Sequence, residues 1–147
     1  MIPPIAITMG DPAGIGPEII VRAARKVAGQ LAAGALKLLI LGDVASLRKA
    51  EALLGAPAIP ETVEGAEWPS LAILQAGPPQ GEIMTGVIAA EGGRMAYLAI
   101  ERAVKLALAG RIQGLVTAPL NKEALNLAGH HYAGHTEMLA DLTGVKG

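Results

Sequence analysis

The chain has 147 residues, of which 52% are hydrophobic and 17% charged, so we expect a packed core and exclude an intrinsically disordered chain. Its formal net charge of -1 lacks the basic excess of nucleic-acid-binding proteins, and the absence of cysteine excludes disulfides, thiolate metal sites and cysteine nucleophiles. No signal peptide or membrane-spanning run is evident, so we expect a cytoplasmic protein that binds neither nucleic acid nor membrane.

The first third of the chain predicts alternating strands and helices. Apolar residues 5–8 predict a short buried strand, and residues 17–27 have the spacing of an amphipathic helix. Residues 37–41 predict a second strand. Asp43 is placed to cap a following helix that ends near residue 54.

The rest of the chain continues this alternation. The predicted elements are an irregular connection over 55–69, a strand over 71–74, a helix over 85–109, a strand over 114–117, a short helix over 121–127 capped by Asn121, and a last helix over 136–142. The pair Gly92-Gly93 weakens the front half of the long helix and is a place where it can split. Strands that alternate with helices predict right-handed crossovers and a mostly parallel sheet.

The first segment suited to chemistry is Gly10–Glu18, where a predicted strand turns into a predicted helix. Its glycines allow close approach of a ligand, and free N–H groups at a helix start can hold an anion. Ile19 stands where a dinucleotide fingerprint needs its third glycine, and the Gly-Lys-Ser/Thr of a P-loop is absent. Two interpretations remain open: Asp11 hydrogen-bonds a ligand hydroxyl, or it caps a tight structural turn.

The second segment, Thr117–Lys122, follows a predicted strand at the sheet edge where open α/β folds bind ligands. Lys122 can meet a phosphate or carboxylate as a point charge, or act as a base if it is desolvated. On position alone, a solvated lysine in a first helical turn is the simpler interpretation.

The third segment, Gly129–Glu137, holds all three histidines. His131 and His135 are four residues apart, but the glycine between them argues against one continuous helix, and the adjacent His130 and His131 tend to point apart. A metal site made of this cluster alone is therefore disfavoured. His135 can donate to an anionic or hydroxylated substrate with the neighbouring Thr136 hydroxyl; the alternative is that both only form a helix cap. For His130 and His131 we favour a surface loop.

Together, Thr8–Glu18, Val116–Ala124 and Gly134–Ala140 resemble the 4-hydroxythreonine-4-phosphate dehydrogenase family in order and spacing. The resemblance implies a three-layer α/β fold, with helices on both faces of a sheet, like the isocitrate and isopropylmalate dehydrogenases. It also implies a homodimer whose subunits each have two lobes around a cleft.

The same resemblance implies a reaction. 4-Phosphohydroxy-L-threonine is oxidised by NAD or NADP to 2-amino-3-oxo-4-(phosphooxy)butanoate, which is then decarboxylated, in pyridoxine 5'-phosphate biosynthesis. A related branch of the family oxidises D-threonate or D-erythronate 4-phosphate, and the three motifs do not separate the branches.

The resemblance also implies roles for single residues. His135 and Thr136 match the family's substrate-binding His-Thr pair. Asp11 and Lys122 occupy motif positions that line the same cleft, Asp11 as a candidate substrate-binding residue and Lys122 as the candidate catalytic residue. In the family three histidines of later motifs hold a divalent metal, zinc, magnesium or cobalt. We therefore predict no metal ligands in this chain and assign no cofactor-binding residue.

We accordingly expect residues 1–147 to be the N-terminal part of a two-lobed dehydrogenase that lacks the C-terminal metal- and cofactor-binding part. Such a part is expected to be inactive alone, and to associate because apolar surface is left uncovered. The alternatives are a non-catalytic module that binds a phosphate ester, and a regulatory partner of a full-length subunit. The enzyme interpretation requires Asp11, Lys122 and His135 to meet at one pocket.

Overall fold

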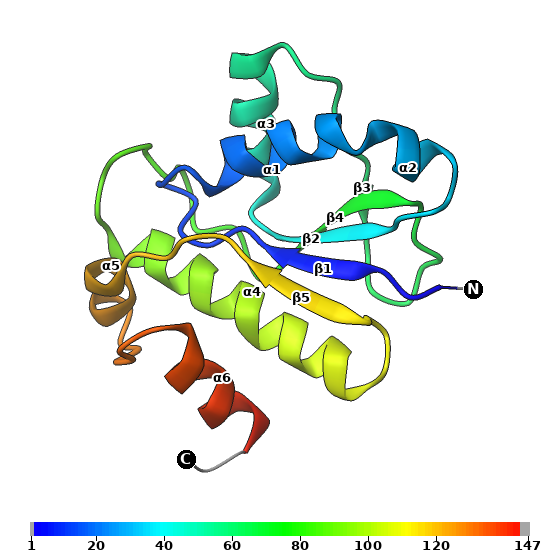
Figure 1. Cartoon of the computed structure of the whole chain (residues 1–147). Coiled ribbons are helices and arrows are strands. Elements are labelled where there is room, and N and C mark those ends of the chain that lie inside the picture. Colours follow the sequence, from blue (N-terminus) through cyan, green and yellow to red (C-terminus); the bar gives the residue numbers. More distant parts are fainter. Residues whose placement is uncertain (1, 145–147) are drawn as a thin grey trace.

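The computed structural model describes residues 2–144, in which five parallel strands form one sheet with the order β3-β4-β2-β1-β5 (Figure 1). The strands are β1 (Ile5–Thr8), β2 (Leu38–Gly42), β3 (Glu61–Thr62), β4 (Leu71–Gln75) and β5 (Gly114–Thr117). The sheet confirms the parallel α/β architecture predicted from the alternation of apolar runs and helical segments.

The helices lie on both faces of this sheet. They are α1 (Gly16–Lys26), α2 (Ala28–Ala32), α3 (Val44–Leu54), α4 (Ala90–Leu108), α5 (Lys122–Leu127) and α6 (His135–Thr143). Helices α1 and α3 cover one face and α4 covers the other, while α5 and α6 pack against the side of α4 that faces away from the sheet (Figure 1). No helix within residues 2–144 is both long and apolar enough to cross a bilayer.

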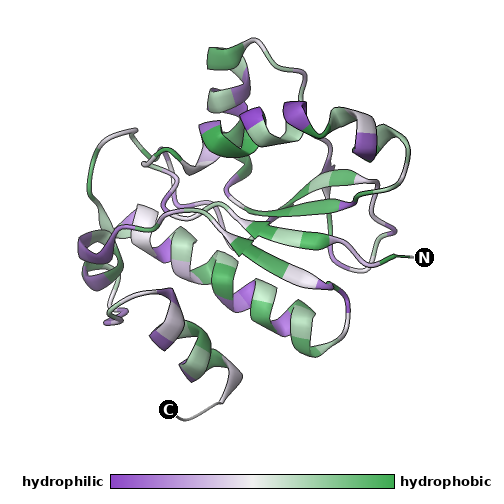
Figure 2. Ribbon diagram, viewed as in Figure 1, coloured by the Kyte–Doolittle hydropathy of each residue, from purple (hydrophilic) through white to green (hydrophobic). Residues whose placement is uncertain are grey.

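Strand β2 shows how the sequence builds the core. All five of its residues are buried, as expected for a parallel strand covered on both faces, and the strands appear hydrophobic in Figure 2. Leu39 and Leu41 pack in a cluster with Met95 of α4, whereas Ile40 packs in the opposite cluster with Leu47 of α3. Each such buried side chain stabilises the fold by roughly 1.5–3 kcal/mol.

Helix α4 is buried on two sides. Ala99 contributes to the cluster against the sheet, where its small side chain lets the helix lie close to the strands. On the other side, Ile100 and Val104 form a third cluster with Leu125 of α5 and Met138 of α6. This third cluster is called the α4–α5–α6 cluster below. The C-terminal helices are therefore attached to the domain through α4.

The predicted caps are present. The side chain of Asp43 accepts hydrogen bonds from the backbone N–H of Ser46 (3.2 Å) and from its hydroxyl (2.6 Å), which begins α3. Asn121 accepts from the backbone N–H of Ala124 at 2.9 Å and begins α5. Gly144, with a φ of 75°, ends α6 in the left-handed conformation that favours glycine.

The predicted start of the long helix was wrong. Helix α4 begins at Ala90, five residues later than expected, because residues 85–89 form a loop in which Gly86 has a φ of 81° and donates a hydrogen bond to the Ala13 carbonyl at 2.7 Å. The Gly92-Gly93 pair lies in the first turn of α4 and does not split it. The short helix α2 and the two-residue strand β3 were not predicted.

Candidate functional site

The carboxyl ends of β1 and β5 lie side by side, with Thr8 paired to Thr117. The loops that follow these strands touch. The backbone N–H of Asp11 donates to the Pro119 carbonyl at 3.2 Å, and that of Ala118 donates to the Thr8 carbonyl at 2.9 Å. A Cβ at Gly10, whose φ is 73°, would overlap the Pro119 carbonyl, so this crossing requires a glycine. Two of the three predicted segments are thus in contact.

Asp11 is buried at this crossing, with 5% of its surface exposed. Its Oδ1 accepts a hydrogen bond from the backbone N–H of Ala13 at 2.9 Å. The carboxylate also lies against the first turn of α4, where a Cβ on Gly92 would be 2.9 Å from the Asp11 Cγ. Burial raises the pKa of the Asp11 carboxyl above its ordinary value, and the hydrogen bond from Ala13 offsets part of that effect. The turn-capping role and a role toward a ligand are both compatible with this geometry.

A cavity of about 420 Å³ opens beside Asp11. Three segments form its wall: residues 11 and 13–15 after β1, 86–88 before α4, and 119–121 after β5. It therefore lies at the carboxyl edge of a parallel sheet, the position at which open α/β folds bind small ligands. Its size is in the range of small-molecule sites, so it is the candidate site.

Lys122 is not among the described residues that line the cavity. It is exposed, as the first residue of α5, and follows Asn121, which does line the cavity. Leu120 also lines the cavity and packs against the α4–α5–α6 cluster, so the cavity wall is continuous with the packing of α6.

His135 and Thr136 begin α6, and neither is among the described residues that line the cavity. His135 is partly buried; its Nε2 is buried and has no hydrogen-bond partner within residues 2–144. Burial lowers the pKa of the His135 imidazole, so the neutral ring is favoured. Thr136 is exposed. The structure brings the Asp11 and Lys122 segments together, and the convergence of His135 on the same pocket stays a prediction.

Sequence reasoning missed Gly92 and the loop over 86–88 as parts of the site. The available signal was the glycine pair inside a helical pattern, which we interpreted as a weak point of the helix rather than as a place of close approach. A glycine in a helix interior is usually explained by packing against a neighbour.

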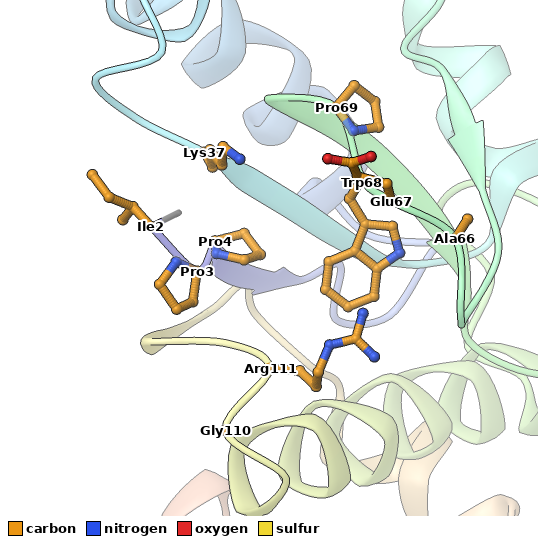
Figure 3. A pocket seen from close by; sticks show the side chains of 10 residues that line it. All are labelled: Ile2, Pro3, Pro4, Lys37, Ala66, Glu67, Trp68, Pro69, Gly110 and Arg111. Atoms are coloured by element: carbon orange, nitrogen blue, oxygen red, sulfur yellow. The ribbon is translucent and has the colours of Figure 1, made fainter.

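A second cavity, of about 230 Å³, lies at the opposite edge of the sheet, where the strands begin (Figure 3). Its wall includes Pro4 before β1 and Lys37 before β2. The Arg111 guanidinium lies 4.5 Å from the centroid of the Trp68 ring, and the Trp68 indole N–H donates to the Val63 carbonyl at 3.2 Å. Because these groups satisfy each other, we do not regard this cavity as the functional site.

The described residues do not form a metal centre by themselves. Within residues 2–144 no three side chains of histidine, aspartate or glutamate gather closely enough to hold a metal ion. The first glycine loop also lacks the third glycine of a dinucleotide fingerprint. Neither a cluster of metal ligands nor a complete dinucleotide fingerprint is therefore found within the described residues.

The sequence pattern that defines the family described as "Pyridoxal phosphate biosynthetic protein PdxA" matches residues 23–147. A protein of Bradyrhizobium diazoefficiens, provisionally named D-threonate 4-phosphate dehydrogenase, is 58% identical over 145 residues, which cover 97% of this chain and 42% of that protein. The 4-hydroxythreonine-4-phosphate dehydrogenase of Desulfosudis oleivorans is 44% identical over 149 residues, covering 97% of this chain and 43% of the relative.

A crystal structure of a 4-hydroxythreonine-4-phosphate dehydrogenase from Burkholderia phymatum superposes with a TM-score of 0.80 at 37% identity, covering all of this chain and 45% of the other. The chain thus spans less than half the length of the relatives it matches. The motifs and the matched fold lead to one conclusion: this chain belongs to the pyridoxal phosphate biosynthetic protein PdxA family, the dehydrogenase family that its sequence resembles.

Proposed function

We propose that this chain is the N-terminal part of an NAD- or NADP-dependent dehydrogenase that oxidises the secondary hydroxyl of a phosphorylated four-carbon hydroxy acid. The observation that carries the proposal is the contact between the Asp11 and Pro119 loops beside a cavity of about 420 Å³ at the carboxyl edge of the sheet. Relatives named for two substrates, D-threonate 4-phosphate and 4-hydroxythreonine 4-phosphate, support this substrate class.

The residues of this chain would bind and orient the substrate. Lys122 is an exposed cation next to the cavity wall, suited to a phosphate or carboxylate, and its alternative role is that of a base. The Nε2 of His135, which has no partner within residues 2–144, can hydrogen-bond an anionic or hydroxyl oxygen, and the Thr136 hydroxyl offers a further hydrogen bond. Asp11 would hold the loop that faces the substrate, or accept a hydrogen bond from a substrate hydroxyl.

In the proposed oxidation a hydride leaves the carbinol carbon for the nicotinamide and the hydroxyl proton goes to a base, so the alcohol becomes a ketone. For 4-phosphohydroxy-L-threonine the product is 2-amino-3-oxo-4-(phosphooxy)butanoate, which then loses carbon dioxide. We expect the divalent metal and most cofactor contacts to come from the part of the relatives that this chain does not span. In the complete protein we expect two lobes of the isocitrate dehydrogenase kind, three layers, a homodimer and a cytoplasmic location.

The test is a chimaera in which this chain replaces the matching 145 residues of the Bradyrhizobium diazoefficiens relative. Each phosphorylated acid is incubated with NAD or NADP and a divalent ion, and the absorbance of the reduced cofactor is followed. We expect turnover of one substrate, and a turnover rate lower by about 10²-fold or more when Lys122 or His135 is replaced by alanine. Lys26→Ala, on the exposed end of α1, is the matched control.

The chain alone is expected to show no turnover. Turnover by the chain alone would contradict the expectation of inactivity, and an inactive chimaera that still folds would contradict the dehydrogenase proposal. Binding of the phosphate esters by the chain, combined with an inactive chimaera, would instead favour the non-catalytic binding module.

A further inference from the structure

Three aromatic rings join α4 to the loop that precedes α6. Tyr97 of α4 stacks on His130, with ring centroids 3.6 Å apart and an angle of 11° between the planes. The Tyr132 ring is also nearly parallel to that of Tyr97, at 6.4 Å and 9°. Both Tyr97 and Tyr132 pack against the α4–α5–α6 cluster. Stacked rings centred on Tyr97 therefore connect the loop over 129–134 to α4.

Hydrogen bonds fix the two ends of the same loop. At its start, the backbone N–H of His130 donates to the Leu125 carbonyl of α5 at 3.0 Å. At its end, the Tyr132 hydroxyl donates to the carboxylate of Asp141 in α6, and that bond raises the pKa of Tyr132 to about 12. Gly134 is the N-cap of α6, and as a glycine it supplies no side chain to accept a hydrogen bond from the first turn. The packing of Met138 against α4 and the preceding loop therefore together set the direction of α6 at its start.

His135 is the first residue of α6, and it follows this loop directly. Its ring is partly buried, and the buried Nε2 has no partner within the described residues. A buried polar atom without a partner is uncommon and calls for an explanation, of which a ligand that binds there is one. The value of the His135 Nε2 for substrate binding depends on its position, since misplacing a substrate-binding group by about 1 Å can lower the rate by roughly 10²-fold.

We propose that Tyr97 is a positioning residue for the reaction, which holds His135 toward the substrate by stacking on His130 and so fixing the 129–134 loop. This inference rests on the proposed function, because it assigns a purpose to the direction of His135. Tyr97 itself does not line the cavity beside Asp11, so it acts through the loop and α6.

Three variants separate ring stacking from general packing. Tyr97→Phe keeps the ring and removes only the 3.3 Å hydrogen bond from the hydroxyl to Glu101. Tyr97→Leu keeps an apolar side chain in the cluster and removes the stack on His130. Val104→Ala truncates another member of the same cluster that makes no ring contact with the loop, and so is the control for packing alone.

The first readout is the titration of His135 in the chain alone, followed by proton–carbon NMR of its imidazole and assigned with His135→Gln. This readout needs neither substrate nor turnover. We expect Tyr97→Leu to move the His135 pKa toward its ordinary value, because a released ring becomes more exposed, and Tyr97→Phe to leave it unchanged. An unchanged His135 in Tyr97→Leu, or an equal shift in Val104→Ala, overturns the proposal.

The second readout is kcat and KM of the chimaera. We expect Tyr97→Leu to lower kcat/KM by about 10- to 100-fold and Tyr97→Phe to restore it, with Val104→Ala close to the unsubstituted chimaera. A folded Tyr97→Leu chimaera with normal kcat/KM overturns the proposal. If the chimaera without substitutions is inactive, the proposed function has failed, and the His135 titration alone then decides whether Tyr97 positions that ring.

Discussion

The sharpest stability prediction concerns Gly93, where α4 crosses α5. A Cβ at this position would overlap the backbone carbonyl of Ala124 and lie 2.6 Å from the backbone nitrogen of Leu125. Both neighbours are backbone atoms, so no side-chain rotation relieves the overlap. In Gly93→Ala the two helices must move apart by about 1 Å, which loosens the contact of Leu125 with Ile100 in the α4–α5–α6 cluster.

Two opposing effects set the size of the change. Alanine is favoured over glycine in a helix by about 1 kcal/mol, which stabilises the variant. Overpacking a close contact costs about 1–3 kcal/mol and occasionally more, and a backbone-to-backbone overlap belongs at the upper end of that range. We therefore expect Gly93→Ala to lower the free energy of unfolding by about 2 kcal/mol.

Urea denaturation followed by circular dichroism measures the change. Gly29→Ala is the matched control, because Gly29 lies in helix α2 with no atom within 4 Å of the added Cβ. The free energy of unfolding of this control is expected to rise by about 0.5–1 kcal/mol. If Gly93→Ala raised the free energy of unfolding as much as Gly29→Ala does, the close approach of α4 and α5 would be refuted.

Three further predictions concern charge and capping. Asp11→Asn retains an oxygen that accepts from the Ala13 N–H and removes a buried carboxylate, and burial raises the pKa of that carboxyl. At neutral pH the free energy of unfolding of the variant should equal that of the unsubstituted chain or exceed it by up to about 1 kcal/mol. A clear decrease in urea denaturation would contradict this. Asn121→Ala removes the cap of α5 and should cost about 1 kcal/mol, with Asn121→Ser restoring most of it. Burial lowers the pKa of both His130 and His135, so below about pH 6.5 the unfolded chain binds more protons than the folded chain. The melting temperature of the chain should therefore fall as the pH drops below about 6.5. The fall should be smaller in a variant with both histidines replaced by glutamine.

Much of the fold followed from local patterns. The apolar runs at β1 and β2 were predicted because a strand covered on both faces must be apolar throughout. The caps at Asp43 and Asn121 were predicted because an aspartate or asparagine before a helical pattern accepts from the free N–H groups of the first turn. In these cases the signal, an apolar run or a capping residue, can be read within a few residues of the sequence.

The errors arose where distant contacts decide. Residues 85–89 continue a helical pattern, yet the hydrogen bond from Gly86 to Ala13 holds them as a loop. Strand β3 has only two residues and exists because it pairs with the neighbouring β4. Neither partner can be identified from the local sequence, so tertiary structure overrides the pattern.

The candidate site was predicted in part for the same reason. The motifs after β1 and β5 could each be placed at a strand end, but the sequence does not state that these strands are neighbours in the sheet. Their adjacency brings Asp11 beside Pro119. His135 was correctly expected near a helix start, whereas its place relative to the cavity depends on how α6 packs against α4, which no local pattern reports.

Helix α4 is the common support of these residues, and Gly92→Ala tests this separately from Gly93→Ala. The added Cβ at residue 92 would overlap the carboxylate of Asp11, which is a side chain and can rotate away, rather than backbone. The stability loss should therefore be small, within about 1 kcal/mol after the gain in helix propensity.

Gly92→Ala should lower activity more than stability, because a displaced Asp11 carboxylate loses its hydrogen bond from the Ala13 N–H and enters the cavity. We expect the chimaera carrying Gly92→Ala to lose at least about tenfold in kcat/KM while its urea midpoint stays near that of the unsubstituted chimaera. The opposite pattern, a large loss of stability with normal kcat/KM, would mean that the first turn of α4 supports the fold and not the site. Since the atoms nearest to a Cβ at Gly93 are backbone atoms of α5, Gly93→Ala should mainly lower stability, whereas Gly92→Ala should mainly lower activity.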